Sequence, residues 1–155
     1  METVLRGLHI GLGDQAVLFV VWTLVEVAWG PLTRGGVLRV KIASLLGFIF
    51  ILASWVVAGI YYVGHYGAEI KPIIKEGPWP WAHAIFMEAK EHIFLFLPFL
   101  ALLLFFLVWK YKDKLKEERG VRLAIYAIGG TVIFILALMA ISGYLISSGY
   151  RAAIP

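Results

Sequence analysis

Four long stretches of apolar residues constrain the fold of this chain more than any other feature of its sequence. A helix needs about 20 mostly apolar residues to cross a bilayer, and residues 8–29, 42–64, 81–109 and 123–146 meet that requirement. Hydrophobic residues make up 61% of the chain and charged residues only 15%, which leaves too little polar surface to cover a water-soluble domain. The sequence therefore predicts an integral membrane protein with four transmembrane helices in a single domain, residues 1–155.

The connections between these stretches are short and cover residues 30–41, 65–80 and 110–122. Short connections are typical of helix bundles whose neighbours run antiparallel. The apolar stretches are too long for β-strands, and they lack the alternating polarity of a transmembrane barrel. We therefore expect an all-α, antiparallel four-helix transmembrane bundle with up-down-up-down topology.

Positive charge is distributed unevenly over the predicted loops. Of the 14 Lys and Arg residues, nine lie in the first and third loops: Arg34, Arg39, Lys41, Lys110, Lys112, Lys114, Lys116, Arg119 and Arg122. The positive-inside rule places these two loops in the cytoplasm and both termini outside it. This asymmetry accounts for the net charge of +4, and we expect no nucleic-acid partner. Met1 to Arg6 lacks the basic region of a secretory signal peptide, so we expect the first helix to stay attached.

Three local features lead to further structural expectations. Glu26 lies about one turn from the cytoplasmic end of the first helix, where Arg34, Arg39 or Lys41 can pair with it. Pro98 has no backbone N–H and should kink the third helix, leaving the carbonyl of Phe94 without its helical partner. The loop 65–80 holds three prolines and several aromatic residues, which should form an ordered cap at the headgroup level.

All four histidines lie toward the predicted outer side, and the chain has no cysteine. The absence of cysteine excludes disulfides, c-type haem attachment and iron–sulfur clusters. At about 1.5 Å per helical residue, His92, His9, Glu88 and His65 lie roughly 27, 30, 33 and 36 Å above the cytoplasmic ends of their helices. These four side chains therefore share a layer. His83, nine residues from His92, points to the opposite face and is the outlier.

We interpret this layer first as a b-type haem site. Two neutral imidazoles from different helices can bind the iron: His9 with His92 fits best by depth, His9 with His65 fits next, and His65 with His92 needs a tilt or kink. Glu88 or Asp14 would transfer protons. Small residues would leave room for the porphyrin, namely Gly13, Ala16, Ala58, Ala140 and Gly143. The chain would then be an electron-transfer subunit in the lipid bilayer, working with other protein subunits and with a membrane quinone as a further expected ligand.

Two alternatives use the same residues differently. A non-haem metal site would combine imidazole and carboxylate ligands suited to zinc, copper or iron: His9, His65, Glu88 and His92. A cofactor-free structural or anchoring subunit would need nothing from the histidines, because His, Tyr and Trp side chains are common where a helix leaves the membrane. An optical spectrum separates these possibilities from haem.

The charge asymmetry leads to a prediction about topology. In intact cells, an impermeant amine reagent should label Lys71 and Lys75 and should leave Lys112 and Lys116 unmodified until the membrane is permeabilised. Peptide mapping by mass spectrometry measures this. Preferential labelling of Lys112 and Lys116 would reverse the orientation and place the histidine layer on the cytoplasmic side.

Overall fold

The computed structural model of the protein describes residues 2–29 and 34–154, and all regular secondary structure in this part of the chain is helical. Four of its helical stretches are long and apolar enough to cross a membrane, which suggests a multi-pass membrane protein. The prediction of an all-helical chain is therefore confirmed. The elements are α1 (Glu2–Trp29), α2 (Arg34–Tyr61), the π-helical segment η1 (Tyr62–Ile70), α3 (Lys71–Glu76), the π-helical segment η2 (Ala82–Met87), α4 (Glu88–Phe94), α5 (Leu97–Lys110) and α6 (Arg119–Ala153).

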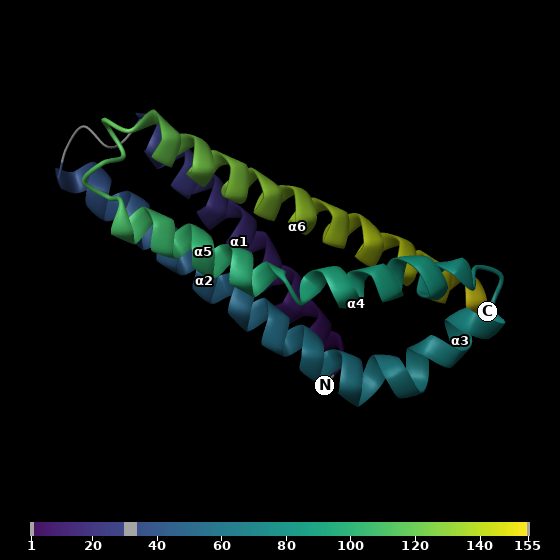
Figure 1. The fold of residues 1–155 in the computed structure, drawn as a ribbon. Coiled ribbons are helices and arrows are strands. Elements are labelled where there is room, and N and C mark those ends of the chain that lie inside the picture. The colour runs from purple at the N-terminus through teal and green to yellow at the C-terminus, as the bar shows by residue number, and fades with distance from the viewer. Residues whose placement is uncertain (1, 30–33, 155) are drawn as a thin grey trace.

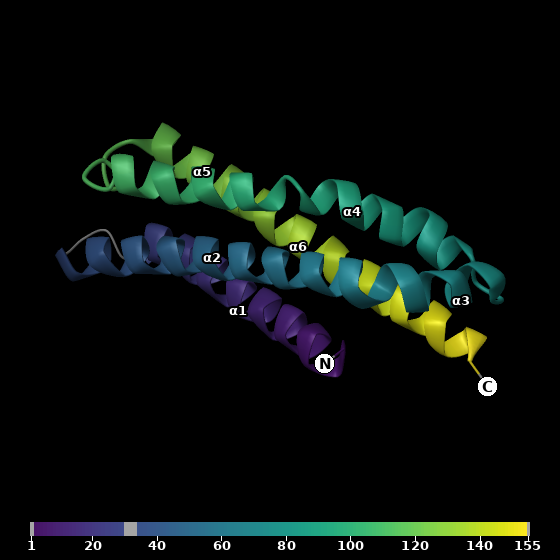
Figure 2. The ribbon, with the colours of Figure 1, turned by 90° about the horizontal axis from the view of Figure 1, so that it is seen from below.

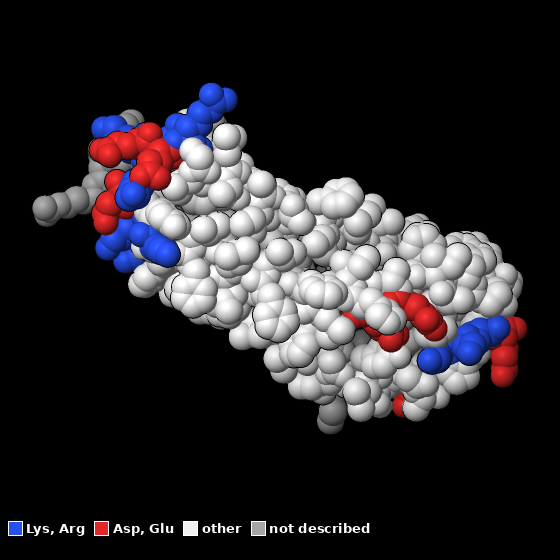
Figure 3. Space-filling view, viewed as in Figure 1, with Lys and Arg blue, Asp and Glu red and all other residues white. Residues whose placement is uncertain are grey.

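The long helices lie alongside one another in an elongated arrangement (Figures 1 and 2). The segment 111–118 lies at one end, and both termini lie toward the other. Charged side chains gather near these two ends, and most of the face between them is uncharged (Figure 3). Helix α1 packs mainly on α2, whereas α6 contacts α1, α5 and η2.

The helices extend beyond most of the predicted spans. The first begins at Glu2, not at residue 8, and the last covers Arg119–Ala153 instead of 123–146. Residues 34–41, predicted as a loop, belong to α2; the rest of that predicted loop, 30–33, lies outside the described residues. The polar ends of these helices carry too few apolar residues for a hydropathy pattern to include them, although their backbone remains helical.

The prediction of a loop at residues 65–80 is wrong, because the helix continues without a break through η1 and α3 to Glu76. Pro72 does not end it. In η1 the backbone turns are wider, and the N–H of Lys71 donates to the carbonyl of Tyr66, five residues back. Pro72 then occupies the first turn of α3, where its missing N–H is tolerated. In place of the predicted loop, the structure has a helical extension followed by a short turn.

The predicted interruption at Pro98 is confirmed. Helix α4 ends at Phe94 and α5 begins at Leu97, so the break falls just before the proline. The chain changes direction at this point (Figure 1). The N–H of Phe96 donates to the carbonyl of Ile93, only three residues back, at 3.2 Å. Because of this kink, α4 and α5 follow different courses along the bundle.

The predicted pairing of Glu26 is also confirmed. Its Oε1 accepts a hydrogen bond from Arg39 Nε at 2.8 Å and another from Trp22 Nε1 at 3.0 Å. This ion pair joins α1 to α2 near the end of the bundle that carries segment 111–118. Glu26 therefore has a structural partner away from the histidines.

The two halves of the molecule are packed differently. A core of buried residues joins α1, α2, α5 and α6 in the half near segment 111–118. A smaller cluster joins η1, α3, η2 and α6 at the other end; its buried members are Tyr66, Ile70, Ile74, Ala82 and Ile146. Between the two clusters, α4 makes its helix contacts chiefly with its neighbours α5 and η2 and with α6.

The close approach of α6 to η2 leads to a stability prediction. A Cβ added at Gly149 would lie 2.7 Å from the Cβ of Ala82, which cannot rotate away. Gly149→Ala should therefore lower the free energy of unfolding by about 1 to 3 kcal/mol, the usual cost of overpacking. Gly130→Ala is the control, because nothing lies within 4 Å of its added Cβ. Thermal unfolding of the purified protein measures both, and equal stability of the two variants would contradict this packing.

Candidate functional site

A cavity of about 1120 Å³ lies in the half of the bundle that carries the termini. Residues from α1, from α2 and η1, from η2 and α4, and from α6 all line it. Most of its wall is apolar. Four of the five small residues expected to leave room for a ligand do line it: Gly13, Ala58, Ala140 and Gly143. The fifth, Ala16, is fully buried in the core.

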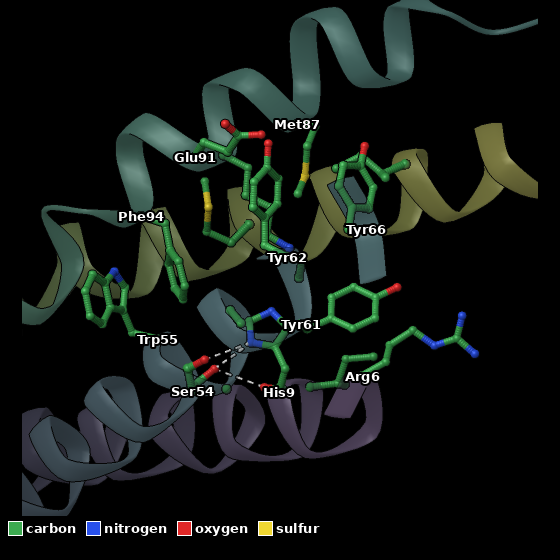
Figure 4. Close-up of a pocket in the computed structure, with 18 of the residues that line it drawn as sticks. Arg6, His9, Ser54, Trp55, Tyr61, Tyr62, Tyr66, Met87, Glu91 and Phe94 are labelled. Carbon is green, nitrogen blue, oxygen red and sulfur yellow. Dashed lines mark hydrogen bonds between the residues drawn. The ribbon is translucent and has the colours of Figure 1, made fainter. Parts of the chain in front are cut away.

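His9 is the predicted site histidine that faces this cavity, and Ser54 on α2 fixes its orientation (Figure 4). The Ser54 hydroxyl donates to the carbonyl of His9 at 3.0 Å, and the oxygen atoms of Ser54 lie 2.9 Å (hydroxyl) and 3.2 Å (carbonyl) from His9 Nδ1. A carbonyl only accepts, so Nδ1 carries the proton. The Nε2 lone pair is then available to the cavity. Phe94 packs its ring edge-to-face with the imidazole, the centroids 5.9 Å apart.

The opposite wall of the cavity carries polar groups from η1 and α4. The Lys90 ammonium reaches α6, where it lies 3.4 Å from the position of a Cβ on Gly143. The Tyr62 hydroxyl points toward the carboxylate of Glu91 (Figure 4). Glu91 Oε1 is buried without a hydrogen-bond partner in the described part of the chain. A ligand in this cavity would therefore meet the His9 imidazole on one side and the Lys90 side chain with the Tyr62 and Glu91 pair on the other.

The other two predicted haem ligands do not face the cavity. His65 is partly buried, and its Nδ1 lies 3.8 Å from Glu69 Oε1 on the next turn of its own helix. His92 lies on the exposed face of α4, where Nδ1 donates to the carbonyl of Glu88 at 2.7 Å. The structure therefore does not bring His9, His65 and His92 together around one space.

The two candidate proton-transfer residues are separated as well. Asp14 lies at the edge of the cavity with an exposed side chain. Glu88 is exposed and does not line the cavity; its Oε1 lies 3.9 Å from Nε2 of His83. Across residues 2–29 and 34–154, no three His, Asp or Glu side chains are grouped as ligands for a metal ion. His83, which was the predicted outlier because it points away from His92, is buried with 1% of its surface exposed.

Sequence reasoning missed Ser54 as the partner of His9 and missed the polar face of α4. The sequence does contain a pattern that could have identified this face of the helix. Met87, Lys90, Glu91 and Phe94 follow the spacing i, i+3, i+4, i+7 and so share one side of a helix, and all four line the cavity. Two charged residues on an otherwise apolar helical stripe indicate an internal polar site more specifically than an isolated histidine does.

Comparison of the chain with protein-family models, with curated proteins and with solved structures finds no match. The function is therefore argued from the cavity itself.

The contact between Ser54 and His9 leads to a second stability prediction. Ser54→Ala removes hydrogen bonds that join α1 to α2 and should lower the free energy of unfolding by about 1 kcal/mol. Ser44→Ala is the matched control: Ser44 is equally buried, but its hydroxyl donates to Lys41 within its own helix. Ser44→Ala should lower the free energy of unfolding by less than half as much as Ser54→Ala does. Reversible unfolding in mixed detergent micelles measures the difference, and equal losses would contradict a specific role for Ser54.

Proposed function

We propose that the chain is an integral membrane protein whose four long helices cross the bilayer in up-down-up-down order, with segment 111–118 in the cytoplasm and both termini outside. The uncharged band between two charged ends supports this setting (Figure 3). So does the large number of apolar side chains exposed along the helices, because in lipid such side chains are well solvated. The cavity then lies toward the outer side of the membrane.

Within this setting we propose an electron-transfer subunit that binds a b-type haem through His9. One observation carries the proposal: Ser54 binds Nδ1 of His9, so that Nε2 is available to the cavity. Histidines that ligate metals characteristically donate their other ring N–H to a backbone carbonyl or similar acceptor, which fixes the tautomer. A haem iron held there would supply one-electron chemistry, because it cycles between two oxidation states.

The remaining cavity residues fit the porphyrin as well. The cavity volume of about 1120 Å³ slightly exceeds the range of roughly 300 to 1000 Å³ that is typical of ligand pockets. Arg6 and Lys90 both line the cavity and can pair with the two carboxylates of a haem. Ligation by two histidines would require α4 to rotate, because His92 lies on its exposed face. We therefore assign only His9 as an iron ligand. A donor and an acceptor in partner subunits belong to the same proposal.

A second candidate is a quinone site in the same cavity. It is favoured by the pairing of an acceptor, His9 Nε2, with a donor, the Lys90 ammonium, in a mainly apolar wall that also contains the rings of Trp55 and Tyr62. A quinone ring presents two oxygen atoms at opposite ends, and its apolar tail would lie along the wall toward the lipid. This candidate requires no second metal ligand.

The optical spectrum of the purified full-length chain tests the assignment. We expect a Soret band that shifts on reduction, and we expect His9→Ala to lose most of it because the iron loses its protein ligand. His92→Ala is the control: it also removes a histidine, but from an exposed position outside the cavity, and it should retain the haem.

Each other result has a definite meaning. A full Soret band in His9→Ala would refute His9 as the ligand, and loss of haem only in His92→Ala would restore the ligand predicted from depth. A chain without a Soret band that releases a quinone on solvent extraction would establish the second candidate. A chain with neither ligand would leave the structural-subunit interpretation.

A further inference from the structure

A second set of polar residues connects the cavity wall to the surface of the molecule, away from His9. Tyr66 of η1 lines the cavity, and its hydroxyl lies 3.0 Å from Nδ1 of His83 in η2. On the other side of the imidazole, Nε2 of His83 lies 3.9 Å from Oε1 of Glu88. The Glu88 side chain is 57% exposed, so the series begins at the cavity and ends at the protein surface.

His83 is the unusual residue of this series, because it is buried and one of its ring nitrogen atoms has no hydrogen-bond partner among the described residues. The residue is 1% exposed, and Nε2 is buried without a hydrogen-bond partner in residues 2–29 and 34–154. A buried polar atom without a partner costs free energy, so a histidine retained only for packing would be expected to have both nitrogen atoms satisfied. The exposed Glu88 carboxylate lies 3.9 Å from Nε2, just beyond hydrogen-bond distance. His83 is therefore placed to form and break this contact.

The direction of the hydrogen bond between Tyr66 and His83 depends on the tautomer of the imidazole, and the series uses the direction in which the tyrosine donates. When the Tyr66 hydroxyl donates to Nδ1, a neutral imidazole carries its proton on Nε2, the atom nearest Glu88. The ring of Tyr62 stacks on the ring of Tyr66, with centroids 5.5 Å apart and planes at 24°. Both Tyr66 and His83 lie in π-helical segments, which are rare and are frequently found at functional sites.

We propose that Tyr66, His83 and Glu88 form a proton-transfer path between the cavity and the water at the end of the bundle that carries the termini. A proton from the cavity binds the Tyr66 oxygen while the hydroxyl proton moves to His83 Nδ1. The imidazolium then gives its Nε2 proton to Glu88, and Glu88 gives a proton to water. One proton enters and one leaves. The ring proton that remains on Nδ1 must then reach the Glu88 side, which requires the imidazole ring to reorient, and the tyrosine hydroxyl rotates to face the ring again.

The charges around His83 are mixed in sign. Lys71 and Lys75 of α3 and Glu88 and Glu91 of α4 all act on the imidazole. The path rests on the proposed membrane setting, in which lipid surrounds the cavity and a dedicated route for protons is needed. It does not depend on which ligand the cavity binds.

The test follows the ring N–H of His83 by nuclear magnetic resonance in the full-length chain, labelled with ¹⁵N-histidine and held in lipid nanodiscs without added ligand. Its signal is identified by elimination, from the signals lost in His9→Gln, His65→Gln and His92→Gln. We expect the neutral Nε2–H tautomer. Glu88→Gln should slow solvent exchange of this proton by about 100-fold, the lower end of what a positioned acid or base contributes.

A matched control is present in the same molecule. Glu69 lies 3.8 Å from His65 and is 62% exposed, nearly the same geometry as Glu88 with His83. Glu69→Gln should leave exchange at His83 unchanged. The cavity end of the path is tested with double variants. Adding Tyr66→Phe to Glu88→Gln should slow solvent exchange of the His83 ring proton by a further factor of about 100. Adding Tyr126→Phe instead changes a tyrosine packed against the distant core and should not slow this exchange.

Three results would overturn the path: an Nδ1–H tautomer at His83, exchange unaffected by Glu88→Gln, or no further slowing in the double variant with Tyr66→Phe. The last would remove the cavity from the path and leave only the buried His83 beside the exposed Glu88. Because these measurements need no haem or quinone, they distinguish failure of the path from failure of the proposed cofactor. If the chain binds no haem but the His83 ring proton exchanges as expected, the proposed proton-transfer path is still supported.

Discussion

Close packing of α1 on α2 is the contact on which the candidate site depends. Small residues allow the two backbones to approach, as is usual where lipid provides no hydrophobic drive for association. A Cβ on Gly47 would lie 3.2 Å from the side chain of Val20, and one on Gly13 would lie 3.7 Å from Ser54 Oγ. This proximity brings His9 within hydrogen-bond distance of Ser54. Without it, the imidazole of His9 would have no hydrogen-bond partner to fix its direction in the cavity.

The sequence was sufficient to predict the helices, the break before Pro98 and the pairing of Glu26, because each depends on local chemistry: apolar length, a missing N–H, or a charge near a helix end. It was not sufficient for the region after Gly64. There the π-helical turns carry the backbone past Pro72, and no hydropathy pattern distinguishes π-helical from α-helical turns. The depth count assumed straight α-helices, and it also ignored how each helix is rotated about its axis.

That rotation decides which side chains of α4 reach the cavity. The prediction that His83 and His92 point in opposite directions agrees with the structure, in which one is buried and the other exposed. What the sequence did not reveal is which of the two points inward. The inward stripe of α4 instead presents Lys90 and Glu91 to the cavity. Charged residues are costly there, so their position is a stronger indication of function than the number of histidines at one depth.

The π-helical segment η1 also has a consequence for how this chain tolerates changes in length. A π-turn holds more residues than an α-turn, so η1 is equivalent to an insertion in a continuous α-helix. If a deletion of one residue in Tyr62–Ile70 returned this segment to α-helix, the tighter α-turns would offset the rotation that the removed residue supplied, and the helix would stay continuous. The face of α3 that buries Ile74 would then change direction less than after a one-residue deletion within α2. A change of length is therefore better tolerated in Tyr62–Ile70 than in the α-helix before it.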